Sequence, residues 1–262
     1  MVYAWRRTRP SERAIARRTA AALAAAGLAA AGGGSVLAGA SSPAAAPAAT
    51  ALSALLPTGT KGNSYAGYRV TNPSGITSLD ATVTVPPVTC PPTGSYSSYL
   101  SSQASGTTVS GGAFVHLACT NGVASYSGFV TFVTVTNGTK HFAVAAGDTL
   151  HTQLTVTVTK KGTTAVHEVV TDETSGVVTT KAVAYAGVAV DTTAADVFEH
   201  VGNAAVPPFT TADWTAATAN GLTLAAANAS QYAMVETGVT LVSASALGAT
   251  GSTFSVKFHA ST

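Results

Sequence analysis

The chain has 262 residues, of which 46% are hydrophobic and 9% are charged, with a formal net charge of +2. So few charges among so many apolar residues indicate an ordered core and exclude a disordered chain. Outside the amino-terminal segment the basic residues are scattered, and this excludes a nucleic-acid-binding surface.

The first forty residues have the organisation of an export signal. Six arginines among the first eighteen residues precede the alanine-rich run Thr19–Ala31, and Ala38-Gly39-Ala40 then supplies the small residues that a signal peptidase requires. The run is too short to span a bilayer, which needs about 20 apolar residues. We therefore expect a cleavable signal peptide over residues 1–40, no permanent membrane anchor and a secreted protein. The arginine pair before the run leaves both the Sec and the twin-arginine route open.

Charge and cysteine usage fit an exported protein. The first forty residues hold six of the 13 basic residues and one of the 11 acidic ones, so the remainder carries a formal charge of −3. Cys90 and Cys119 are the only two cysteines, and we expect them to form a disulfide in an oxidising compartment. A reactive thiol near His116 is the alternative. The six histidines are dispersed without metal-ligand spacing, so we expect no metal site and no cofactor.

The rest of the chain divides into a leader and one domain. Residues 41–61 are rich in Ala, Pro and Ser without periodicity, and we assign them no fold. From residue 62 to 262, β-branched and aromatic residues alternate with polar ones between turn residues, and no stretch has helical periodicity. This pattern predicts a single all-β domain, an antiparallel β-sandwich or barrel. The predicted strands are Leu79–Val85, Ala113–Cys119, Val123–Val135, Leu150–Thr159, Thr164–Thr171, Val177–Tyr185, Val239–Leu247 and Thr253–His259.

The strand Leu150–Thr159 shows the alternation most clearly. We expect one face to be buried in the core, formed by Leu150, Leu154, Val156 and Val158. A hairpin turn is predicted after Thr171, with Asp172 and Glu173 as solvated turn residues. The likeliest longer loops are Thr107–Gly112 and Gly202–Thr211.

Glu199 is the candidate for acid–base chemistry. No Gly-x-Ser-x-Gly turn marks a serine nucleophile. Glu199 has apolar neighbours, and alternation puts it on one strand face with Val197 and Val201, opposite Phe198 and His200. In a groove, desolvation would raise the pKa of this carboxyl toward that of a general acid or base. The alternative is an edge-strand glutamate that reaches water.

Several short segments resemble the glutamic peptidases, the eqolisin family of secreted β-sandwich endopeptidases, and especially their actinobacterial relatives. The similarity runs from about residue 62 to the end of the chain. The segments that carry it are Asn63–Tyr68, Val83–Val88, Ala113–Leu117, Ala145–Leu150 and Val197–Val201.

The resemblance implies a jelly-roll, concanavalin A-like sandwich and a catalytic pair. In this family a glutamate activates water while a glutamine on a neighbouring strand stabilises the oxyanion, and the glutamate maps onto Glu199. The glutamine position falls in Ser125–Gly128, where this chain has Tyr126. Neither Gln103 nor Gln153 restores the motif in this alignment. The family's substrate groove corresponds to Phe114, Phe132 and His200, and Trp214 is the only tryptophan after residue 40.

Three functions stay open at this point. The first is a monomeric secreted endopeptidase with Glu199 as base and Tyr126 in place of the glutamine, acting on a polypeptide substrate. The second is a non-catalytic descendant that binds a peptide or glycan in the inherited groove. The third is a glycoside hydrolase that pairs Glu199 with another acid such as Glu236.

Overall fold

The computed structural model describes residues 65–106, 110–133, 138–158, 162–185, 194–201 and 205–260. All of them belong to one compact unit, Leu52–Thr262. The predicted signal peptide and leader lie outside the described residues. No helix in the described part of the chain is long and apolar enough to cross a membrane.

The described residues form fifteen strands and no helix. In chain order these are β1 (Tyr65–Thr71), β2 (Ser78–Thr84), β3 (Ser95–Ser105), β4 (Ser110–Thr120), β5 (Val123–Val133), β6 (Lys140–Phe142), β7 (Thr149–Val158), β8 (Thr164–Asp172), β9 (Val178–Tyr185), β10 (Ala194–Val201), β11 (Thr211–Ala219), β12 (Leu222–Thr223), β13 (Ser230–Glu236), β14 (Val239–Ala244) and β15 (Phe254–Phe258).

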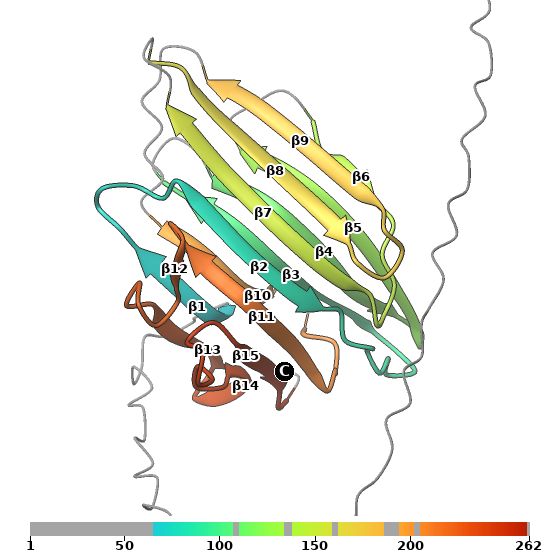
Figure 1. Ribbon diagram of the computed structural model, residues 1–262. Coiled ribbons are helices and arrows are strands. Elements are labelled where there is room, and N and C mark those ends of the chain that lie inside the picture. The colour runs from blue at the N-terminus through green and yellow to red at the C-terminus, as the bar shows by residue number, and fades with distance from the viewer. Residues whose placement is uncertain are drawn as a thin grey trace, which may run out of the picture. The chain divides into compact units, whose positions relative to one another are not determined.

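The strands make an antiparallel sandwich, as predicted. One hydrogen-bonded path runs β6-β5-β4-β3-β10-β1-β13-β14-β15-β11-β2-β7-β8-β9, with β12 attached to β11. The path folds over at β13, so that β3, β4 and β5 lie behind β2, β7 and β8 (Figure 1). We call the layer β6-β5-β4-β3-β10-β1-β13 sheet A and the layer β14-β15-β11-β2-β7-β8-β9 sheet B. The two ends of the path, β6 and β9, pack against each other.

Alternation decides which side chains fill the space between the sheets. On β7, Leu150, Leu154 and Val156 are buried as predicted, whereas Val158, the last residue of the strand, is 64% exposed. The expectation for Val158 is therefore wrong, because the strand runs past the part of the core that covers its inner face. Trp214 of β11 is fully buried and stacks on the ring of Phe254 at a centroid distance of 6.0 Å.

Other local predictions have mixed outcomes. The Cys90–Cys119 disulfide is present, with Cα atoms 5.3 Å apart, and it joins the segment after β2 to β4. The hairpin turn after β8 is present, closed by Gly176 N–H donating to Asp172 O at 2.7 Å. Asp172 is buried, not solvated, because it lies on the buried face of β8 with Val166 and Val170, and Ser175 and the backbone of Thr174 donate hydrogen bonds to its carboxylate.

Two strand predictions need correction. The serine-rich β3 lies in a segment where we expected no strand, and β4 begins at Ser110, inside the predicted loop Thr107–Gly112. Both strands form a long antiparallel ladder with each other. The predicted loop Gly202–Thr211 is confirmed over residues 205–210, which form only isolated bridges at Ala205 and Phe209 before β11 begins. Residues 107–109 and 202–204 lie outside the described residues.

Candidate functional site

The two faces of sheet A differ because its strands alternate. Leu100 of β3 and Val115 and Leu117 of β4 are buried and face the core. Most of the intervening side chains are half-buried or exposed on the outer face, and they include several rings. We call this set the aromatic face; its members are Tyr99, Phe114, His116, Phe129 and His141.

The rings of the aromatic face contact one another across β3, β4, β5 and β6. Phe114 stacks on Phe129 with centroids 5.2 Å apart and planes 12° from parallel. Tyr99 stacks on His116 at 4.6 Å and meets Phe129 edge-on at 6.1 Å. His141 continues the row, 6.2 Å from Phe129. Such pairs hold the rings in fixed orientations and present a continuous apolar surface.

His116 connects the rings to a hydroxyl. Its Nε2 lies 2.8 Å from Ser97 Oγ, and burial lowers the pKa of the ring. A neutral imidazole can accept a hydrogen bond at Nε2 from the serine hydroxyl. At neutral pH His116 therefore adds no charge to the aromatic face.

Beside the aromatic face lies a buried ion pair. Asp196 of β10 is 0% exposed, and its Oδ1 and Oδ2 accept hydrogen bonds from Arg69 Nε at 2.5 Å and Nη2 at 3.1 Å. Ser105 Oγ donates to Oδ2 at 3.3 Å. The hydrogen bond to Asp196 raises the pKa of Arg69, whose guanidinium also lies 5.1 Å from the ring centroid of Tyr65 and 5.9 Å from that of Tyr232. Each oxygen of the carboxylate thus accepts at least one hydrogen bond.

Gln103 stands directly opposite Asp196. The ladders place Arg69, Asp196, Gln103 and Gly112 in one row across β1, β10, β3 and β4. Side chains directly opposite each other have Cβ atoms about 5 Å apart, so the amide lies within reach of the carboxylate. This acid–amide pair was not predicted. The alternation along β10 is the sequence signal for Asp196. It places Asp196 on the same strand face as Phe198 and His200, opposite the face of Glu199.

The structure does not bring Glu199 and Tyr126 together. Glu199 pairs in register with Ala66 and Leu100, which are both buried. Tyr126 lies on β5, three strands away from β10, or about 14 Å at the usual strand spacing. Its hydroxyl accepts the Val88 N–H at 2.9 Å. The altered dyad therefore has no support from the strand register, and the side chain of Glu199 lies outside the described part of the chain.

The predicted groove residues are divided between the two faces. Phe114 belongs to the aromatic face. Phe132 is 4% exposed and lies in the core, so its assignment to the groove is wrong. On β5 the parity that points outward is that of Phe129, three residues earlier. His200 pairs in register with Tyr65 and Tyr99, and its side chain lies outside the described part.

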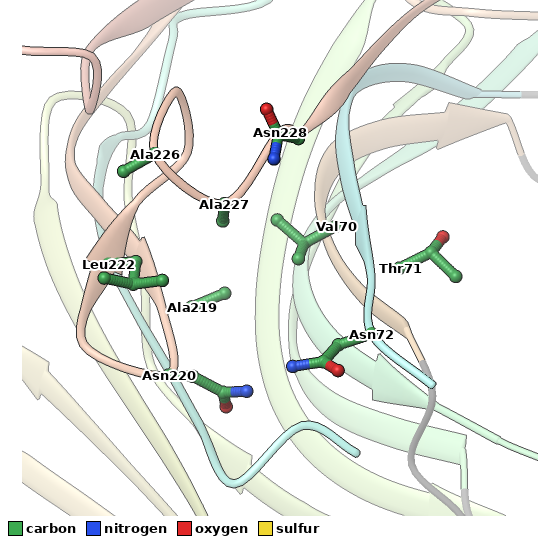
Figure 2. Close-up of a pocket in the computed structure, with 9 residues that line it drawn as sticks. All are labelled: Val70, Thr71, Asn72, Ala219, Asn220, Leu222, Ala226, Ala227 and Asn228. Atoms are coloured by element: carbon green, nitrogen blue, oxygen red, sulfur yellow. The ribbon is translucent and has the colours of Figure 1, made fainter. Parts of the chain in front are cut away.

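A separate pocket of about 200 Å³ lies between the end of β1 and the segment that follows β11 (Figure 2). It shares no residue with the aromatic face, and no titratable side chain lines it. Asn220 at its edge accepts the Thr77 N–H at 2.7 Å and donates to Gly75 O at 3.0 Å, so its amide holds a neighbouring loop. The lining residues are Val70, Thr71, Asn72, Ala219, Asn220, Leu222, Ala226, Ala227 and Asn228.

The antiparallel sandwich is the fold of the glutamic peptidases. The family model described as Peptidase A4 family matches residues 63–257, so the chain belongs to the Peptidase A4 family. No curated protein matches the chain.

Solved structures of glutamic peptidases share the fold. Scytalido-glutamic peptidase with a transition state analog inhibitor is 14% identical with a TM-score of 0.54, and with a peptide based transition state analog it is 13% identical with a TM-score of 0.56. SCP-B, an eqolisin in a complex with the tripeptide Ala-Ile-His, is 13% identical with a TM-score of 0.52. Each comparison covers 75% of this chain and 98% of the other.

Proposed function

We propose that this chain is a secreted, peptide-binding member of the Peptidase A4 family, and that an extended polypeptide lies across the aromatic face. The observation that carries the proposal is the continuous row of rings in contact on the outer side of sheet A. Rings already held in place lose little conformational entropy when they bind apolar side chains of a ligand. The peptide ligands of the structural relatives support the same class of partner.

The environment of Asp196, the carboxylate described on this face, argues for binding more than for hydrolysis. A general base must take a proton from water, so water must be able to reach the carboxylate. Asp196 is 0% exposed, and Arg69 and Ser105 donate hydrogen bonds to its oxygens. Tyr126, the expected oxyanion donor, lies three strands away from β10 and has the parity of the inner face. Neither arrangement presents an available base beside an available donor.

A second candidate function is peptide-bond hydrolysis by Asp196 and Gln103. The observation that favours it is their direct pairing in the β10–β3 ladder, because a carboxylate and an amide are the two groups that the family's chemistry needs. Hydrolysis in this form requires Arg69 to release the carboxylate. The glycosidase alternative has less support, since Glu236 is an exposed residue at the end of β13.

Binding is tested with fluorescein-labelled denatured casein and the protein from residue 41 onward. We expect Phe114→Ala and Phe129→Ala each to weaken binding about tenfold or more, the effect of removing a central aromatic anchor. The matched control is His167→Ala, an exposed ring on the outer face of sheet B, and it should leave binding unchanged. Equal effects of all three substitutions would contradict the proposed surface.

Hydrolysis is tested with the same substrate between pH 2 and pH 7. The binding proposal predicts no cleavage by the wild type or by Arg69→Met. Cleavage that is lost in Asp196→Asn but kept in Glu199→Gln would instead establish the second candidate. Cleavage that is lost only in Glu199→Gln would return the catalytic role to Glu199.

A further inference from the structure

Glu168 is a carboxyl group in the interior of the sandwich. It lies in the middle of β8, between Leu154 of β7 and Lys181 of β9 in the ladders. Its side chain is 0% exposed, and neither Oε1 nor Oε2 has a hydrogen-bond partner. A buried polar group without partners costs free energy and calls for an explanation.

The surroundings of Glu168 hold almost no charge. On its own strand, Val166 and Val170 share its face, with Asp172 one position further, where Ser175 and Thr174 bind that carboxylate. The buried inner face of β7 carries Leu150, Thr152, Leu154 and Val156, and that of β4, which packs across from β8, carries Ala113, Val115, Leu117 and the disulfide-bonded Cys119. β9 contributes the phenol of Tyr185 and the ammonium of Lys181.

Burial accordingly holds the pKa of Glu168 well above its usual value. An ionised carboxylate without a partner is among the costliest groups to bury, so the side chain stays neutral while the medium is acidic. The one cation directly opposite it in the ladder is Lys181.

Lys181 makes a contact across the open edge of the sandwich. Its Nζ donates to Gly138 O at 2.6 Å. Gly138 precedes β6, the edge strand of sheet A, whereas Lys181 lies on β9, the edge strand of sheet B. The lysine therefore ties together the two ends of the strand path, which pack against each other at this edge.

We propose that Glu168 and Lys181 form a proton-controlled latch that fastens the β6–β9 edge in acidic medium. With Glu168 protonated, Lys181 holds Gly138 and the edge is closed. When Glu168 releases its proton to solvent, the buried carboxylate attracts the ammonium from across the ladder, and Lys181 leaves Gly138. The fold is thus adapted to an acidic surrounding and loosens at this edge as the pH rises.

The direction of the pH dependence follows from proton linkage. The unfolded chain releases the Glu168 proton near the model value of 4.5, and the folded chain releases it at higher pH. Between these two values the unfolded state binds fewer protons, so stability falls as the pH rises. The stabilisation is fully present below 4.5, and the unfolding equilibrium constant rises by up to about tenfold per pH unit above it until the folded carboxyl has titrated.

The experiment compares chemical unfolding of the wild type, Glu168→Gln and Lys181→Met between pH 3 and pH 8, with amide hydrogen exchange of β6 as a second readout. Glu173→Gln is the matched control, because Glu173 is an exposed glutamate in the turn after β8. We expect the wild type and the control to lose stability with rising pH, and Glu168→Gln to lose much less.

Exchange in β6 tests the latch itself. The readout is the protection factor of each β6 amide, which corrects for the pH dependence of intrinsic exchange. In the wild type we expect these protection factors to be high at pH 4 and to fall about tenfold or more by pH 7, whereas in Lys181→Met they are low at both pH values. If Glu168→Gln does not fold, ¹³C NMR titration of the Glu168 carboxyl in the wild type replaces it. A titration midpoint at or below the ordinary range of a glutamate would overturn the proposal. So would β6 exchange that is the same in the wild type and Lys181→Met at pH 4.

Discussion

The outer faces of the two sheets carry different side chains although their inner faces are alike. Both inner faces are filled with Val, Leu and Ala. On sheet A the outer face bears stacked rings, as in the pair Phe114–Phe129. On sheet B the corresponding positions of β7 carry polar side chains, which include Gln153, Thr155 and Thr157. The sandwich architecture does not in itself require rings on an outer face, and this supports the proposal that the rings of sheet A bind a ligand.

The carboxylates on the two outer faces differ in how deeply they are buried. Asp196 on sheet A is fully buried and held by Arg69. Asp80 on sheet B accepts from His151 at 2.9 Å and from Gln153 at 3.0 Å, but these groups are partly exposed to water. Only the pair on sheet A exists in a low-dielectric setting, where losing one partner is costly.

The largest expected effect separates the inner from the outer face of sheet B. Val156→Asp should unfold the domain, because it buries an unpaired charge at a cost of several kcal/mol against a total stability of about 5 to 15 kcal/mol. Thr157→Asp, one residue later on the exposed face, should change stability by less than about 1 kcal/mol. Circular dichroism melts of both variants check this. Reversed sensitivities would show that the strand faces are assigned the wrong way round.

The next largest effect on stability distinguishes the inner from the outer face of sheet A, and it compares one phenylalanine on each face. Phe132→Ala should cost about 3 to 5 kcal/mol, since it empties a core position. Phe114→Ala should cost clearly less, because that ring is only half-buried on the aromatic face. Urea unfolding of both variants gives the two free energies. A loss for Phe114→Ala as large as that for Phe132→Ala would make the aromatic face part of the core.

A smaller effect distinguishes the two carboxylates. Arg69→Met should destabilise by about 2 to 3 kcal/mol, at or below the lower end for a broken buried pair because Arg69 is itself partly exposed. His151→Gln on sheet B should cost less than about 1 kcal/mol. Adding Asp196→Asn to Arg69→Met should recover part of the loss. No recovery in the double variant would mean that the guanidinium stabilises the fold through Tyr65 and Tyr232 instead.

The sequence predicts the architecture where apolar and polar residues alternate regularly, as in β7. It fails at β3, because buried serines such as Ser98 and Ser102 occupy inner positions where a large apolar residue signals a strand. Their buried hydroxyls have no hydrogen-bond partner. Nothing in the local sequence pattern indicates that these serines face the core. Strand pairing with β4 over the whole length, and not local preference, makes this segment a strand.

The candidate site was harder to predict than the fold because it depends on strand register. A shift of one residue moves a side chain to the opposite face, and short motifs do not specify an alignment that closely. Phe132 was placed in the groove for this reason. Asp196 was overlooked although it lies three residues before Glu199. The sequence also gives no sign of the burial of Glu168. This glutamate shares one face of β8 with Val166 and Val170 and is buried between the sheets.

The smallest expected effect concerns Tyr126, which the family resemblance places at the glutamine position. Tyr126→Phe keeps the ring, which packs against the core, and removes the hydroxyl that accepts the Val88 N–H. One partly buried backbone donor then loses its protein partner, so we expect a loss of about 1 kcal/mol in urea unfolding. Casein binding at the aromatic face should be unchanged, because Tyr126 lies on β5 with the parity of the inner face, whereas Phe129 has the outer parity. If the wild type cleaves casein and Tyr126→Phe abolishes cleavage without loss of stability, the phenol acts in catalysis, and the structural role assigned to it here is wrong.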